Sequence, residues 1–203
     1  MALIAVVLGT VLLSALSASL VMVTSSEVMT ANNFRRAQEG LYAADAVLER
    51  ALDDVRSSPN WDSLIDGSLQ SSFVDGLPVG TRPISDGSTI DLGRWLNLLN
   101  CRKPTPCSAA DLSAIVAERP WGSNNPVWRL YAYGPLRALL GSNALDSPYY
   151  GLVVVADNPA RTPGVLWLRS EAIGPGGTRR VLEMTLTRQD GSRGSVLSWR
   201  KAR

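Results

Sequence analysis

The residues of this chain that could carry chemistry are few, and two cysteines are the most informative of them. Cys101 and Cys107 are the only cysteines, and the chain contains no histidine. A tetrahedral metal site needs further nitrogen or sulfur ligands beside two thiolates, so we do not expect a metal centre. Two prolines stiffen the short loop between the cysteines. We therefore predict a local disulfide, in a part of the chain exported to an oxidising compartment.

The remaining reactive residue types do not form a recognisable catalytic pattern. Without histidine, neither a Ser-His-Asp nor a Cys-His site can be assembled. The glycine cluster Gly174-Pro175-Gly176-Gly177 lies between two expected strands, whereas a phosphate-binding loop would be followed by a helix. The sequence therefore predicts neither a cofactor nor an enzyme.

Charge is nearly balanced over the whole chain but not along it. The chain has 20 basic and 18 acidic residues, which gives a net charge of +2. Between Arg179 and Arg203, however, seven basic residues face only Glu183 and Asp190. A solvated basic edge strand accounts for this surplus, and we do not expect nucleic acid as a partner.

The largest element that the sequence predicts is an N-terminal helix. Twenty-six residues precede the first charged side chain, Glu27, and the helical pattern continues to about Ser57 without a proline. At a rise of about 1.5 Å per residue, Met1–Val23 would be roughly 35 Å long, enough to cross a hydrocarbon layer of about 30 Å. We predict that residues 1–27 form a transmembrane and assembly half and residues 28–57 an amphipathic stalk half of one helix.

Two alternatives to a continuous anchor helix remain open. Thr24-Ser25-Ser26-Glu27 could be a capping box that starts a separate helix. Ala15-Leu16-Ser17 loosely fits a signal-peptidase site, but no basic segment precedes the apolar stretch. Cleavage there would leave the stalk without an anchor, so we expect the apolar segment to be retained.

The stalk half carries an apolar seam with a seven-residue repeat. Large side chains recur every seven positions, and alanines fill the second position of each heptad. This helix-packing seam consists of Phe34, Ala37, Leu41, Ala44, Leu48, Ala51 and Val55. Alternating large and small residues favour close helix packing, and we expect part of the seam to pack on the chain's own domain.

Residues 58–203 are predicted to form one exported globular domain. A loop-rich stretch runs from Pro59 to about Thr89, with short helices expected at Leu92–Asn100 and from Ser108 to about Glu118. The expected strands are Val127–Tyr133, Tyr150–Ala156, Val165–Ala172, Arg179–Arg188 and Val196–Arg200.

The strand pattern predicts the fold class. In Arg179–Arg188, Leu182, Met184 and Leu186 alternate with polar residues. This alternation favours a sheet with one face on a helix and one face toward solvent. We therefore predict an α+β fold, with the long N-terminal helix packed on a mostly antiparallel sheet of four or five strands.

Three stretches near the N-terminus occur in a combination that points to a family. The chain begins Met1-Ala2-Leu3-Ile4-Ala5, and the apolar run is followed by Asn33-Phe34-Arg35-Arg36 and by residues 41–52, LYAADAVLERAL. This combination resembles the type IV pilin superfamily, and more closely the PilX-type minor pilins of bacterial type IV pili. Members carry similar Asn-(aromatic)-Arg-Arg and Leu-Tyr-Ala-Ala-Glu-Ala-Gly-Leu-Glu runs after the membrane segment. The resemblance covers residues 1–55.

The resemblance implies a pilin-like fold and a defined life history. Prepilin peptidase would cut a precursor just before Met1, and the new amino group would be N-methylated. The subunit would wait in the inner membrane as a single-pass protein and then enter an extracellular pilus filament. The implied partners are other minor and major pilins, contacted through the N-terminal helix, and a PilY-type tip adhesin. The implied role is pilus assembly, adhesion and twitching motility.

Position 5 departs from the pattern of the wider family. Most pilins carry a glutamate there, whose carboxylate is thought to meet the N-terminal amine of an adjacent subunit, but this chain has Ala5. A carboxylate in the bilayer is costly and needs a purpose. We therefore expect a priming or capping subunit at or near the filament tip. Simple tolerance of alanine in this subclass is the alternative.

Three other functions remain open. A minor pseudopilin of a type II secretion system is one, since the GspK-type tip subunit also lacks this glutamate, although it usually has a much larger exported domain. A competence pseudopilin that binds DNA through the basic C-terminal edge is the second. The third, outside the filament class, is a single-pass protein whose stalk spaces a binding domain from the membrane.

Overall fold

The fold is known from a computed structural model that describes residues 2–117, 127–139, 146–157, 164–188 and 194–202. The chain divides into two compact units, residues 1–39 and residues 40–203. The first unit consists of the N-terminal part of helix α1. The second contains the end of α1 and every other element.

Helix α1 runs from Ala2 to Ser57 without a break. The continuous N-terminal helix is thus confirmed, and the separate helix starting at Thr24-Ser25-Ser26-Glu27 is wrong. Thr24 and Thr30 instead donate their hydroxyls to backbone carbonyls one turn earlier in the same helix, at 2.9 Å each. These residues therefore continue the helix rather than cap a new one.

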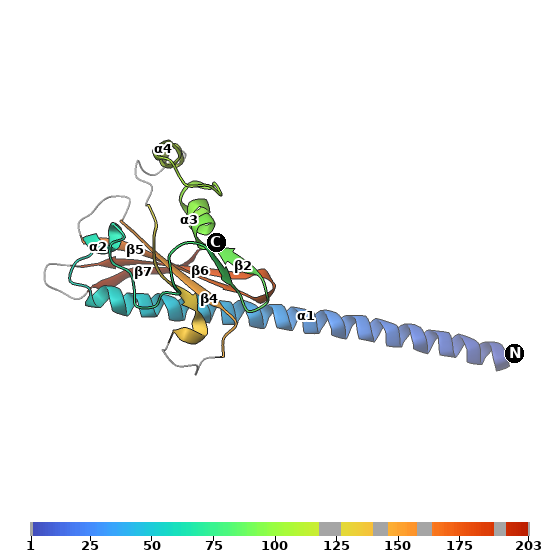
Figure 1. Ribbon diagram of the computed structural model, residues 1–203. Coiled ribbons are helices and arrows are strands. Elements are labelled where there is room, and N and C mark those ends of the chain that lie inside the picture. The colour runs from blue at the N-terminus through green and yellow to red at the C-terminus, as the bar shows by residue number, and fades with distance from the viewer. Residues whose placement is uncertain (1, 118–126, 140–145, 158–163, 189–193, 203) are drawn as a thin grey trace. The chain divides into compact units, whose positions relative to one another are not determined.

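A five-stranded antiparallel sheet forms the centre of the second unit (Figure 1). Its strands are β3 (Arg129–Pro135), β4 (Tyr150–Asp157), β5 (Val165–Gly174), β6 (Thr178–Thr187) and β7 (Ser195–Ala202). They lie in the order β3-β4-β5-β6-β7, so each strand pairs with its neighbour in sequence. The α+β fold class, with a helix packed on an antiparallel sheet, is therefore confirmed.

The glycine cluster forms the turn between β5 and β6. Residues Pro175–Gly177 make a single 3-10 turn, η2. Gly176 and Gly177 have φ angles of 65° and 72°, which only glycine adopts at little cost. The cluster thus closes a hairpin, in agreement with its interpretation as a turn rather than a phosphate loop.

The C-terminal part of α1 covers one face of the sheet. Ala44, Val47, Leu48, Ala51 and Val55 are fully buried there, against apolar side chains of the central strands. The approach is close enough to require a residue without a side chain on the strand. A Cβ added at Gly151 of β4 would lie 2.4 Å from a methyl carbon of Val47.

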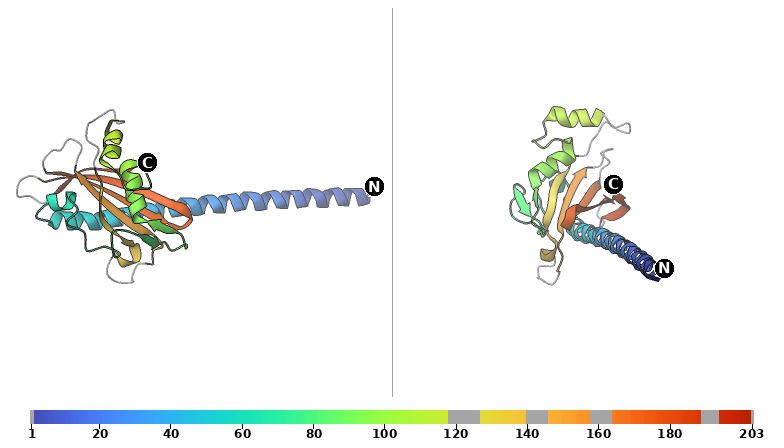
Figure 2. Two further views of the ribbon diagram at one scale, coloured as in Figure 1. Left: turned by 45° about the horizontal axis from the view of Figure 1, so that its top comes forward. Right: turned by 90° about the vertical axis from the view of Figure 1, so that its right-hand side faces the viewer.

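The opposite face of the sheet is covered over β3–β5, so the expectation of a face toward solvent is wrong for these strands, whereas it holds for β6 and β7. Helix α3 (Leu92–Cys101) and a small hairpin of β1 (Thr81–Pro83) and β2 (Thr89–Asp91) pack on the β3–β5 side and form a second apolar cluster. Figure 2 shows the sheet between this layer and α1. The hairpin lies in the stretch that the sequence predicted as loop.

Three further short elements complete the part of the chain that the structure describes. Helix α2 (Asp62–Ile65) follows α1, and its residue Leu64 and the preceding Trp61 are buried in the first cluster. A 3-10 turn, η1 (Leu136–Ala138), follows β3. Helix α4 (Ala109–Ala117) follows the loop that the disulfide closes.

Candidate functional site: the apolar helix, the disulfide loop and a tryptophan-walled hollow

The N-terminal half of α1 presents an apolar surface. It is the one helix, within the described ranges, that is long and apolar enough to cross a membrane. Its large side chains are open to solvent, for example Leu3 at 77 % and Leu20 at 68 % exposure. Ala5 lies on this segment. Met1, the expected site of processing and N-methylation, lies outside the described residues.

Hydroxyl groups within this half are bonded inside the helix. Thr10, Ser14 and Ser17 each donate to a backbone carbonyl three or four residues earlier, at 2.8 to 2.9 Å. In a bilayer every polar group without a partner costs several kcal/mol. The back-bonded hydroxyls therefore remove a cost that these side chains would otherwise impose in lipid.

The helix-packing seam lies in both units. Leu41, Ala44, Leu48, Ala51 and Val55 belong to the second unit, where the last four are fully buried against the sheet and Leu41 packs at their margin. The seam is therefore used largely within the chain. More residues on this face of α1 are buried than the seven-residue repeat predicted.

The first two seam residues have a different environment. Phe34 and Ala37 belong to the first unit. Phe34 is 66 % exposed, although phenylalanine is among the most apolar side chains, and Ala37 is half-buried. An exposed aromatic residue on a helix surface is available for contact with another helix.

The two cysteines form the predicted disulfide. Cys101 ends α3, and its Cα lies 5.9 Å from that of Cys107. Ser108 and Asp111 then form a reciprocal capping box at the start of α4, as the sequence indicated. The Lys103 ammonium donates to the same carboxylate. Hydrogen bonds from Lys103 and Ser108 lower the pKa of Asp111 from 3.8 to about 2.

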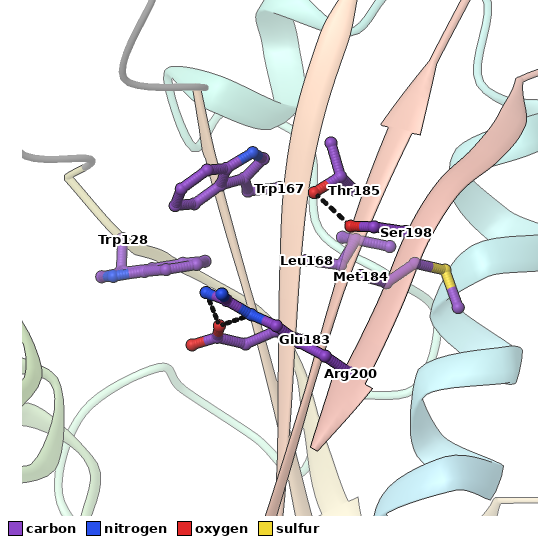
Figure 3. Close-up of a pocket in the computed structure, with 8 residues that line it drawn as sticks. All are labelled: Trp128, Trp167, Leu168, Glu183, Met184, Thr185, Ser198 and Arg200. Carbon is purple, nitrogen blue, oxygen red and sulfur yellow. Dashed lines mark hydrogen bonds and ion pairs between the residues drawn. The ribbon is translucent and has the colours of Figure 1, made fainter. Parts of the chain in front are cut away.

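A hollow of about 260 Å³ opens on the face of the sheet away from α1 (Figure 3). Two tryptophans form its wall, Trp128 just before β3 and Trp167 on β5, with ring centroids 6.5 Å apart and planes tilted by 36°. Asn100 of α3 fixes Trp128 by accepting from its backbone N–H at 2.9 Å and donating to its carbonyl at 3.1 Å. Helix α3 thus positions the aromatic wall.

The floor of the hollow is polar and carries charge. Glu183 of β6 accepts from Arg169 of β5 at 2.6 Å and from Arg200 of β7 at 2.6 and 2.9 Å. Beside this triad, the Ser198 hydroxyl donates to the Thr185 hydroxyl at 3.1 Å. The hollow is therefore lined by an aromatic wall, one carboxylate, the guanidinium group of Arg200 and two hydroxyls, while Arg169 holds the carboxylate from outside the lining.

Three described arginines of the basic C-terminal stretch make contacts within the domain. Arg179 pairs with the fully buried Glu171 at 2.5 Å, and Arg200 pairs with Glu183. Arg188 donates to the carbonyls of Ser58 and Pro59, and its guanidinium lies 4.9 Å from the centroid of the Trp61 ring. These three arginines thus hold neighbouring strands and the segment after α1 together.

Sequence reasoning missed the buried carboxylate and the hollow. Glu171 also accepts from Trp95 Nε1 at 3.0 Å, which ties α3 to the sheet. No local sequence signal indicates the contact of Glu171 with Trp95 or that of Trp128 with Trp167, because the two residues of each pair are far apart in the chain. Within the described part of the chain, no cluster of three or more residues of the types His, Cys, Asp and Glu is placed to hold a metal ion.

Comparison of the chain with protein-family models, with curated proteins and with solved structures gives no match.

Proposed function

We propose that this chain is a minor pilin, a membrane-anchored subunit that enters a type IV pilus through its N-terminal helix. The observation that carries the proposal is α1 itself. Residues 2–26 have an uncharged, exposed apolar surface with back-bonded hydroxyls, and the C-terminal part of the helix completes the core of an antiparallel α+β domain. A pilin uses such a helix twice, first in lipid and then against copies of the same segment.

Association between apolar helices depends on close packing, because lipid is as apolar as the helices themselves. The membrane half includes small residues that permit such an approach, among them Gly9, where an added Cβ would meet no atom within 4 Å. Exposed Phe34 supplies a large side chain beyond the apolar stretch. Other minor and major pilins are the proposed partners of this surface.

The proposed role is structural rather than catalytic, and its position is the filament tip. Ala5 supplies no carboxylate to neutralise the amine of another subunit. A subunit without that group suits a priming or capping place, beside a PilY-type adhesin, more than repeated use along the shaft. The proposed locations are the inner membrane before assembly and the extracellular filament afterwards.

Mass spectrometry of sheared surface appendages tests the filament proposal. We expect peptides of this chain, including an N-methylated Met1 peptide, in appendages of the parent strain and not in a strain that lacks the pilus assembly ATPase. The membrane fraction of both strains serves as the control for expression. A chain that stays in the membrane fraction of both strains would be an anchored spacer, and the proposal would be wrong.

Immunogold labelling tests the tip position separately. An antibody against the globular unit should label filament ends, with few particles per filament. Uniform labelling along the shafts would overturn the tip role and leave filament membership intact.

A further inference from the structure

The tryptophan-walled hollow lies where the second covering layer of the sheet ends. Trp128 belongs to the apolar cluster under α3, and Trp167 packs at its margin. Beyond them the outer face of β6 and β7 is accessible, with Ser198 exposed and the Arg200 side chain 68 % exposed. We propose that this hollow binds an acidic sugar, a pyranose ring that carries a carboxylate. This inference does not depend on membership of a filament.

The aromatic wall suits a pyranose ring. A pyranose in its chair form presents several C–H groups on one face, and these pack favourably on the electron-rich face of an indole. Trp167 is half-buried and supplies the open part of this wall, whereas Trp128 is only 6 % exposed and supports Trp167 from the core at a tilt of 36°. A cavity of about 260 Å³ is the size of a single sugar ring rather than an extended ligand.

The polar floor suits hydroxyl groups, which both donate and accept. The Glu183 carboxylate has about four acceptor positions and uses three of them on Arg169 and Arg200. The remaining position can accept from a sugar hydroxyl. A nucleic-acid phosphodiester offers acceptors only and would face this carboxylate, so the floor favours a sugar over a nucleic acid.

The charge of the floor favours an acidic sugar over a neutral one. Two guanidinium groups oppose one carboxylate, which leaves a net charge of +1 beside the wall. The pair with Glu183 uses Nε and Nη2 of Arg200, so the Nη1 group can still donate to a ligand. A sugar carboxylate at this guanidinium would neutralise the site and form a charge-assisted hydrogen bond.

Saturation-transfer NMR on the full chain in lipid nanodiscs tests the proposal, with methyl β-D-glucuronide as the probe. We expect a Kd on the order of 1 mM, as is usual for so small a ligand. The strongest transfer should reach H1, H3 and H5, which share one face of this ring. The neutral methyl β-D-glucoside should bind at least about fivefold more weakly.

Matched variants identify the site. Arg200→Gln should weaken glucuronide binding about tenfold, whereas Lys201→Gln should leave it unchanged. The control has the same change in charge at the adjacent position, but it lies opposite Leu182 and so on the other face of the sheet. Trp167→Leu should abolish transfer to the ring face, and Trp199→Leu, also on the other face, should not. Near-UV circular dichroism verifies that each variant is folded.

Several outcomes would overturn the proposal. A Kd for glucuronide above about 20 mM is one, since nonspecific contact would explain it. Equal affinity of Arg200→Gln and the parent protein is a second. Competition by acetate as effective as by the sugar would show a simple anion site. Binding of an oligothymidylate that depends on Arg200, without glucuronide binding, would show a nucleic-acid site.

Discussion

Two residues of the helix-packing seam should respond to alanine substitution in opposite ways. Leu48 is fully buried between α1 and the sheet, whereas Phe34, fourteen residues earlier, is 66 % exposed. If the seam serves folding at one end and assembly at the other, Leu48→Ala should destabilise the domain. Phe34→Ala should leave the domain intact and reduce entry into filaments.

The expected magnitudes follow from burial. Truncating a fully buried leucine removes its transfer free energy and leaves a cavity, at a cost of about 3 kcal/mol. For a protein of this size, that loss corresponds to a fall in Tm of roughly 6 to 12 °C. Truncating Phe34 removes a side chain that makes few contacts within the chain, so the change in unfolding free energy should stay within about 0.5 kcal/mol.

Two assays on the same variants separate the effects. Thermal unfolding of the full chain in detergent, followed by near-UV circular dichroism, reports domain stability. Quantitative mass spectrometry of sheared appendages, normalised to the membrane fraction, reports assembly. Equal falls in Tm for Leu48→Ala and Phe34→Ala would refute the division of the seam. Normal filament entry of Phe34→Ala would show that Phe34 contributes nothing to assembly.

Three further predictions concern the globular unit. Glu171→Leu removes the acceptor of Trp95 Nε1 and should lower the unfolding free energy, measured in urea, by about 1 to 3 kcal/mol. Glu171→Gln retains an acceptor and should lower the unfolding free energy less. Equal losses for the two variants would contradict this role of Glu171. Reducing the disulfide at Cys101 should cost about 2 kcal/mol in the same assay, and a Cys101→Ser variant that still responds to reductant would contradict the assignment. Because the pKa of Asp111 is depressed in the folded protein, the capping box contributes stability above pH 3.8, and this stability is lost as the pH falls through about 2. An NMR titration of the Asp111 carboxyl should show the depressed pKa, and Lys103→Ala should raise it. An ordinary pKa of Asp111 in the parent protein would contradict the prediction.

The periodic elements were predictable from the sequence because their signals are local. The heptad pattern and the absence of proline predicted α1, and Ser108 with Asp111 predicted the start of α4. The five strands were expected close to their observed positions, although β3 begins at Arg129 rather than Val127. Capping, alternation and turn residues act within a few positions of each other, so one sequence contains them.

The second covering layer was not predictable because it depends on distant contacts. β1 and β2 have three residues each, in a stretch rich in turn residues, and such short strands have no clear alternation. The hollow forms because Asn100 holds Trp128 near Trp167, and no local pattern places a residue before β3 beside one on β5. Glu171 likewise looks like an ordinary polar strand residue in the sequence, and only the packing of α3 on the sheet shows that it is buried.

The continuity of α1 has a mechanical consequence. The helix is unbroken from Ala2 to Ser57, and its last turns are part of the domain core, so the apolar segment and the core share one helix. Tension on the N-terminal segment would pass along the helical hydrogen bonds directly to the contacts of Val47 and Leu48 with the sheet. Under an applied force, the chain would therefore extend only when the helix unfolds or the core opens. The force at which extension begins would measure the strength of the interface between α1 and the sheet.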